Sequence, residues 1–323
     1  MGLIDLWDPF QNAVVPVGDW AAIAIKWIVV NYRGFFQEVK QPINLMLSYT
    51  ESGLHASPPL VFIAALFLLT WQVAEIRTAV FVAGCLFAIG LIGAWPGAMT
   101  TLAIVLTSVV FCCAAGIPLG ILSAQNTTVE KVLRPILDFM QTIPSFVYLV
   151  PIVMLFGIGN VSGVIVTIIY ALAPVIRLTS LGIRQVRADL VEASTAFGGS
   201  ALQTLLKVQL PLARPTIMTG VNQTVMLSLS MSVIASMISV TGLGQMVLRG
   251  IGRLDMALAT TGGLGIVLTA MVVDRISQGL GASHRDRAQG HWAEVGPVGL
   301  VRRGFRALLG AKPLGMTVSI PHE

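Results

Sequence analysis

The amino-acid sequence predicts an all-α polytopic membrane protein with about seven transmembrane helices. Only 11% of the 323 residues are charged, whereas soluble globular proteins carry about 25% charged residues. Hydrophobic residues make up 55% of the chain, and the mean hydropathy is +0.83. The long apolar runs lack a strand-like alternation of polar and apolar residues, which argues against a β-barrel.

Seven apolar runs are the candidate transmembrane helices. Crossing the ~30 Å hydrocarbon core of a bilayer takes about 20 helical residues. The fourth run is short for a span, and a start near Leu133 would lengthen it. Together the runs predict a transmembrane domain over residues 59–280. They lie at about 59–75, 78–95, 98–121, 143–158, 161–182, 215–240 and 257–279.

Residues 1–58 are expected to lie outside the bilayer core. The stretch 19–49 mixes Trp, Ile and Phe with charged residues such as Lys26 and Glu38. This pattern predicts one or two amphipathic helices at the outer interface. No basic segment precedes an apolar core in the first 20 residues, so we expect no cleavable signal peptide.

The Lys and Arg residues are unevenly divided between the two sides that seven spans would create. Fifteen lie on the side that holds 183–214 and the tail 281–323. Because cytoplasmic loops are enriched in Lys and Arg, we expect this side to be cytoplasmic and the N-terminus to be outside. We also expect a flexible tail that contacts anionic membrane lipid. The five residues on the other side are Lys26, Arg33, Lys40, Arg249 and Arg253.

The net charge of +5 is therefore a signal of topology. No compact patch of basic and aromatic residues accompanies it, so we expect no nucleic-acid partner.

A polar, helix-forming stretch, Glu192–Pro211, separates two of the apolar runs. Its twenty residues exceed the roughly 2–8 residues of most connections between packed helices. Gly198–Gly199 in its middle predicts a sharp change of direction, because glycine ends helices at little cost. We therefore expect residues 188–211 to form two short helices that project into the cytoplasm towards a partner.

Two capping patterns support this two-helix shape. Asp189 precedes Glu192 by three residues, and Ser200 precedes Gln203 by three. Both spacings are typical of helix N-termini. Pro211 is expected to end the second helix before the next apolar run.

This loop resembles the EAA loop in the permease subunits of bacterial ATP-binding-cassette (ABC) importers. The family pattern is EAA, three residues, Gly, nine residues, Ile, one residue and Leu-Pro. Ser194 and Val208 replace the third Ala and the Ile of the pattern. In that family the loop is a coupling helix that sits in a cleft of the ATPase subunit. The resemblance implies ATPase-coupling roles for Glu192, Ala193, Ser194, Gly198, Val208, Leu210 and Pro211.

Longer segments are similar to the permeases of glycine betaine, proline betaine and choline importers, and the similarity covers about residues 20–280. It implies a type I ABC importer permease core (MetI-like) in the bacterial inner membrane. It further implies a homodimer with two ATPase subunits, fed by an extracytoplasmic binding protein and working by alternating access. The segments are 133–160, 173–186, 222–238 and 242–259.

We expect no enzymatic activity from the chain itself. None of its five Lys residues follows a Gly, which excludes a GxxxxGK[ST] phosphate loop. The sequence also lacks HExxH and a Cys/His metal-binding spacing. We therefore expect no cofactor or metal on this chain, with ATP and Mg²⁺ used by the partner ATPase.

The apolar run at 215–240 contains most of the candidate translocation residues. Ser, Asn and Met along one helix would give a weakly interacting path for a bulky organic cation, and Tyr148 could add a cation–π contact. Packing of small and hydroxyl residues between helices explains the same pattern. The candidates are Asn222, Gln223, Ser228, Met231, Ser232 and Tyr148.

Arg249 and Arg253 precede the last apolar run on the predicted outer side, against the positive-inside trend. We expect them to receive the loaded binding protein.

Two other functions fit the composition. One is an ABC importer of another amine or amino acid. The other is an ion- or proton-coupled secondary transporter, which normally needs ionisable residues near mid-membrane. The nearest candidates, Asp274 and Glu75, lie at the ends of apolar runs, which disfavours that function.

Overall fold

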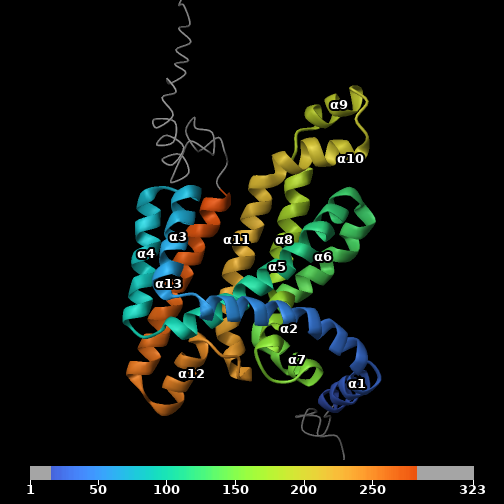
Figure 1. Cartoon of the computed structure of the whole chain (residues 1–323). Helices are drawn as coiled ribbons and strands as arrows, with labels where there is room; N and C mark the ends of the chain where they lie inside the picture. The colour runs from blue at the N-terminus through green and yellow to red at the C-terminus, as the bar shows by residue number, and fades with distance from the viewer. Residues whose placement is uncertain (1–15, 282–323) are drawn as a thin grey trace, which may run out of the picture.

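The computed structural model describes residues 16–281, and over this range it consists of helices without any strand (Figure 1). The predicted all-α class is therefore confirmed, while the predicted flexible tail lies outside the described residues. The helices are α1 (Val17–Asn31), α2 (Arg33–Ala56), α3 (Pro59–Val73), α4 (Ile76–Leu91), α5 (Trp95–Gln125), α6 (Thr127–Thr142), η1 (Ser145–Tyr148), α7 (Leu149–Phe156), α8 (Asn160–Arg184), α9 (Ala188–Ala196), α10 (Ala201–Thr204), the π-helical turn η2 (Leu205–Gln209), α11 (Leu210–Ile234), η3 (Ala235–Ile238), α12 (Leu243–Arg253) and α13 (Met256–Gly281).

Three long helices, α5, α8 and α11, form the centre of the molecule (Figure 1). A Cβ added at Gly120 of α5 would lie only 2.6 Å from the Cβ of Thr179 on α8. Small residues allow membrane helices to approach this closely. Between α8 and α11, the Thr224 hydroxyl donates a hydrogen bond to the Ala171 carbonyl oxygen at 2.9 Å. The centre is thus held by close packing together with buried hydroxyl contacts.

A second group of helices, α3, α4 and α13, packs beside this centre, and the short helix α12 covers one end of α13 (Figure 1). Leu86 and Ile89 of α4 and Val272 of α13 are buried together with Met99 of α5. This apolar cluster joins the second group to the centre.

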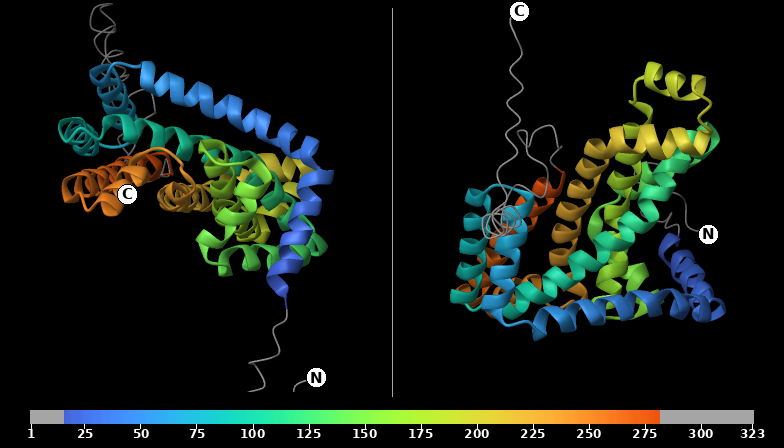
Figure 2. Two further views of the ribbon diagram at one scale, coloured as in Figure 1. Left: turned by 90° about the horizontal axis from the view of Figure 1, so that it is seen from below. Right: turned by 45° about the horizontal axis from the view of Figure 1, so that its top comes forward.

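Helices α1 and α2 lie across one end of the bundle (Figures 1 and 2). The Lys40 ammonium on α2 donates a hydrogen bond to the Phe156 carbonyl oxygen at the end of α7, at 2.8 Å. Trp20 and Trp27 on α1 are exposed. Large aromatic side chains on a helix at the end of a bundle fit the predicted interfacial location, which stays a prediction.

Four helices are long and apolar enough to cross a membrane: α5, α8, the continuous helix Ala201–Ile238 and α13. Two bent pairs, α2 with α3 and α6 with η1–α7, raise the number to at most six. The predicted number was about seven because it also counted α4, which the structure forms as a shorter apolar helix, and it took α3 as a span without α2. These helices have 15 and 16 residues, which is fewer than the roughly 20 needed for a straight span.

The fourth predicted run, 143–158, starts too late. Its helix begins at Thr127, is interrupted before Ser145 and resumes to Phe156, with a bend of 102°. Pro144 accounts for the interruption, because its ring has no N–H to donate and excludes the preceding residue from helical geometry. The helix therefore starts six residues before Leu133, the earlier start that the sequence analysis considered.

The two ends of the bundle carry different elements. Helices α9 and α10 project from the end at which α13 finishes, whereas α12, α7 and α1 lie at the opposite end (Figures 1 and 2). The arrangement separates the predicted partner-binding loop from the predicted interfacial helices by the whole length of the bundle.

Candidate functional site

The predicted loop forms two short helices that stand clear of the bundle, α9 and α10 (Figure 1). We call residues 188–211 the coupling loop. Helix α9 ends in a Schellman motif, in which the Gly199 N–H donates to the Ser194 carbonyl oxygen and the Gly198 N–H donates to that of Thr195, both at 2.9 Å. Gly198 has φ +79°, which disfavours any residue with a Cβ. The predicted glycine elbow is confirmed.

The second helix begins with the predicted capping box. The Gln203 N–H donates to the Ser200 hydroxyl at 3.3 Å, and the Ser200 N–H donates to the Gln203 side-chain oxygen at 2.9 Å. The hydroxyl of Ser194 also lies 2.9 Å from that of Thr204, which ties the two helices together. The capping box thus fixes the start of α10, and the contact between Ser194 and Thr204 links α10 to α9.

The predicted N-cap at Asp189 is wrong. The N-cap is Arg187, and it makes no capping hydrogen bond with its side chain. Asp189 lies in the first turn of α9, where Arg187 Nε donates a hydrogen bond to its carboxylate at 3.1 Å. This hydrogen bond lowers the pKa of Asp189 below its usual value. The carboxylate therefore stays charged and faces the positive end of the helix dipole.

The predicted helix end at Pro211 is also wrong. Proline cannot donate to the carbonyl four residues earlier and its ring collides with that carbonyl. Here the preceding turn, η2, is π-helical, and the Leu210 N–H donates to Leu205, five residues back. This widened turn lets the helix bend and continue past Pro211 into α11.

The base of the coupling loop is packed into the bundle. Leu205 is buried with Ile183 of α8 and Ala213 of α11. Ile121 and Ala124 at the end of α5 pack against the same cluster. The loop is therefore attached to three helices of the centre.

The coupling loop exposes several large apolar side chains among its polar ones. Phe197 is 91% exposed, although it is the largest side chain of the loop. Leu202, Leu206 and Leu190 are also exposed. Exposed apolar groups gathered on a projecting element mark an interaction surface. We call these four residues the apolar patch.

The sequence analysis did not single out Phe197 as a site residue. A signal was available, because Phe197 is an aromatic residue next to two glycines within a polar stretch. A side chain beside a glycine elbow projects from the turn and has few neighbours to cover it.

The coupling residues expected from the resemblance divide into two groups by exposure. The exposed ones lie on α9 and its end or at the bend into α11: Glu192, Ala193, Gly198 and Pro211. The half-buried ones face the other helices of the loop and its base: Ser194, Val208 and Leu210.

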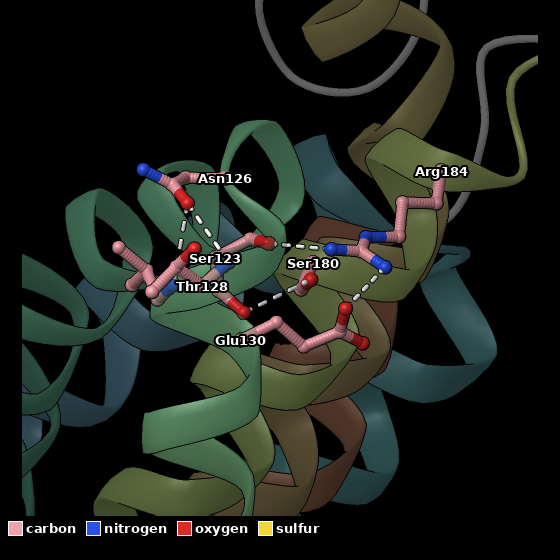
Figure 3. A network of polar contacts seen from close by, with 7 residues as sticks. Ser123, Asn126, Thr128, Glu130, Ser180 and Arg184 are labelled. Carbon is pink, nitrogen blue, oxygen red and sulfur yellow. Dashed lines mark hydrogen bonds and ion pairs between the residues drawn. The ribbon is translucent and has the colours of Figure 1, made fainter.

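Polar contacts at the end of α8 bring three helices together beside the coupling loop (Figure 3). The Arg184 guanidinium donates to the Ser123 carbonyl oxygen of α5 and pairs with the Glu130 carboxylate of α6, both at 2.6 Å. Ser180 and Ser123 are joined by a 3.4 Å hydrogen bond between their hydroxyls. Asn126 caps α6 by accepting from the Thr128 N–H at 2.9 Å.

The structure places three of the predicted pathway residues in packed interiors. Met231, Ser228 and Ser232 on α11 are buried. The Ser228 hydroxyl has no hydrogen-bond partner among residues 16–281, whereas that of Ser232 donates to the Leu229 carbonyl oxygen at 2.7 Å. Packing of small and hydroxyl residues between helices was the alternative explanation for these candidates. In a single copy of the chain, this packing accounts for the positions of all three.

The other three pathway candidates differ in exposure. Gln223 is exposed on α11. Asn222 accepts a hydrogen bond from the Ser277 hydroxyl of α13. Tyr148, in η1, donates to the Met140 carbonyl oxygen at 2.7 Å. A role in translocation stays a prediction for all six.

Arg249 and Arg253 are both exposed on α12, at the end of the bundle opposite the coupling loop (Figure 1). This is the end on which a protein docking from the other side of the membrane would land. Their role in docking stays a prediction.

Comparisons with known proteins match part of the transmembrane region in one case and most of the chain in others. Residues 116–283 match the family model described as the binding-protein-dependent transport system inner membrane component. The glycine betaine/proline betaine transport system permease protein ProW of Escherichia coli is 56% identical over 92% of this chain and 84% of its own length. The glycine betaine transport system permease protein OpuAB of Bacillus subtilis is 39% identical over 84% of this chain and 97% of its own.

A solved structure shares the fold. A chain from the inward-facing MetNI methionine ABC transporter superposes with a TM-score of 0.52 at 22% sequence identity, covering 57% of this chain and 94% of its own. At this identity the likeness concerns the fold alone.

Proposed function

Because the chain belongs to the family of binding-protein-dependent transport system inner membrane components, we propose that it imports glycine betaine and proline betaine. The observation that carries this substrate class is the 56% identity over 92% of the chain with a permease of that description. Members of this family lie in the inner membrane and work with a substrate-binding protein and a separate ATPase. The chain is thus the translocating subunit and leaves ATP hydrolysis to its partner.

We propose that the coupling loop docks into the ATPase and lies in the cytoplasm. The apolar patch supports this role, because exposed apolar side chains gain most from burial in a partner's cleft. The bias of Lys and Arg toward this end supports the cytoplasmic orientation. On this basis Glu192, Ala193 and Gly198 contact the ATPase, and ATP-driven approach of two ATPase subunits moves the loop.

We propose that two copies of the chain enclose the substrate path. Gln223 and Ser230 are exposed on α11 and lie seven residues apart, on one face of the helix. Half-buried Met226 lies on the same face. In a dimer this face would line a path of weak polar and thioether contacts, which suits a quaternary ammonium ion that must also be released.

The direct test is uptake by the complete importer in proteoliposomes. We expect uptake of labelled glycine betaine to require ATP, the ATPase subunit and the binding protein. We also expect two copies of this chain in the purified complex. Uptake that follows membrane potential without ATP would identify a secondary transporter, and ATP-driven uptake of a different amine alone would contradict the substrate.

Reversing the two outer charges, Arg249→Glu with Arg253→Glu, is expected to weaken docking of the loaded binding protein about tenfold. Charges at the rim of an interface act mainly on encounter between the partners. The measurement is the binding-protein concentration that gives half-maximal uptake, with Arg275→Glu at the other end of the bundle as the control. Unchanged docking in the double variant would show that the two arginines are not part of the interface with the binding protein.

A further inference from the structure

Two ion pairs join different helices within residues 16–281, and both join α6 to α8. The pair nearer the coupling loop, Arg184–Glu130, is the one that also reaches α5 (Figure 3). We propose that Arg184 is a positioning residue that makes the end of α8 and the α5–α6 corner move as one body when the coupling loop moves. The proposal rests on the coupling function proposed above.

The position of Arg184 suits this role. It is the last residue of α8, and three residues separate it from the start of α9. A displacement of α9 is therefore transmitted along the chain to Arg184 before it is transmitted to any other charged residue of α8. Ile183, its neighbour in the chain, is buried against Leu205 at the base of the loop.

The two partners of Arg184 are the ends of two helices. Ser123 belongs to the last turn of α5, whose final carbonyl groups have no partner within the helix. The guanidinium donates to one of these carbonyl oxygens and also compensates the negative end of the helix dipole. Glu130 lies in the first turn of α6, so Arg184 holds both sides of the α5–α6 corner at once.

A pocket lies beside Arg184. A cavity of about 250 Å³ lies between α6 and α8, and its lining includes Leu133, Leu137, Ile176 and Arg184 itself. Leu137 and Ile176 also pack in one apolar cluster, so the ion pair with Glu130 adds a polar link between α6 and α8 beside that packing. The hydrogen bond to the Ser123 carbonyl oxygen adds the link to α5.

The chain contains a matched control. Arg177 lies seven residues earlier on the same face of α8 and pairs with Asp138 of α6, also at 2.6 Å. It joins the same two helices, and within residues 16–281 it makes no hydrogen bond or ion pair to α5. Loss of this pair removes the same charge without freeing the α5–α6 corner.

The experiment measures substrate imported per ATP hydrolysed by the reconstituted importer. We expect Arg184→Gln to lower this ratio by about two- to thirtyfold, the range seen for residues that lie between coupled sites. ATP hydrolysis and ATPase association should persist. Arg177→Gln should keep the wild-type ratio, and Arg184→Lys should recover part of it. Glu130→Gln provides a second variant if Arg184→Gln fails to insert.

A covalent bridge separates mechanical positioning from a general structural role. Ser123 and Ser180 are in contact, so cysteines at these positions are placed to form a disulfide between α5 and α8. Ser123→Cys with Ser180→Cys in the Arg184→Gln background is expected to restore coupling when oxidised and to lose it on reduction.

Three results would overturn the proposal: a wild-type ratio in Arg184→Gln, equal losses in Arg184→Gln and Arg177→Gln, or an oxidised bridge that forms without restoring coupling. A wild-type complex that imports no betaine would instead refute the proposed function.

Discussion

The variant Phe197→Ala is expected to lose most of its substrate uptake while the permease still folds and inserts normally. Phe197 is 91% exposed, so its truncation removes almost no contact within the chain. In a complex, an aromatic side chain at the tip of a projecting element typically fills a partner's pocket, and its truncation costs about 2–4 kcal/mol of binding. That cost corresponds to roughly 30-fold weaker association or more.

The measurement is the affinity between the purified permease and its ATPase, together with ATP-driven uptake. Phe35→Ala provides the control, because Phe35 is also an exposed phenylalanine but lies on α2, at the other end of the bundle. It should bind the ATPase normally. If Phe197→Ala retained full ATPase affinity, the apolar patch would not be the docking surface.

The variant Gly120→Val is expected to destabilise the bundle strongly. A Cβ at this position would lie 2.6 Å from the Thr179 Cβ and 2.8 Å from the Ile176 carbonyl oxygen. The backbone oxygen cannot rotate away, so α5 and α8 would have to separate. Overpacking of this kind costs up to about 3 kcal/mol, a large part of a total stability of roughly 5–15 kcal/mol.

The thermal unfolding midpoint in detergent and the amount of protein in the membrane test this prediction. Gly84→Val is the matched control, because nothing lies within 4 Å of a Cβ added at Gly84 on α4. It should leave both quantities nearly unchanged. Equal loss of stability in the two variants would show that the cost of replacing Gly120 does not come from the close approach of α5 and α8.

The features that could be predicted from the sequence are local ones. Apolar runs gave most of the long helices, because hydropathy and length are sufficient to identify a buried helix. The Ser200–Gln203 box and the Gly198 elbow were predictable because capping depends on residues three or four apart. The same reasoning failed at Asp189, where the arginine two residues earlier binds the carboxylate.

Other features depend on contacts between distant residues. Helix α6 was partly missed because Glu130, Lys131, Arg134 and Asp138 lower its hydropathy, although two of these charges are paired with arginines of α8. The partners Arg184 and Glu130 are 54 residues apart, and no spacing rule connects them. Likewise, composition alone could not separate the buried Ser232 from the exposed Gln223 on one helix.

The bend at η2 changes how a displacement of the coupling loop would act on α11. Because hydrogen bonding continues through the bend, α10 with η2 forms a lever that stands at an angle to the axis of α11 (Figure 1). The nine residues of this lever, 201–209, reach about 13 Å at 1.5 Å per residue. A sideways shift of about 2 Å at the end of the lever would then rotate α11 by roughly 9° about its own axis. Rotation of α11, rather than a push along it, would carry Gln223 and Ser230 around the helix axis and change which side chains face the proposed substrate path.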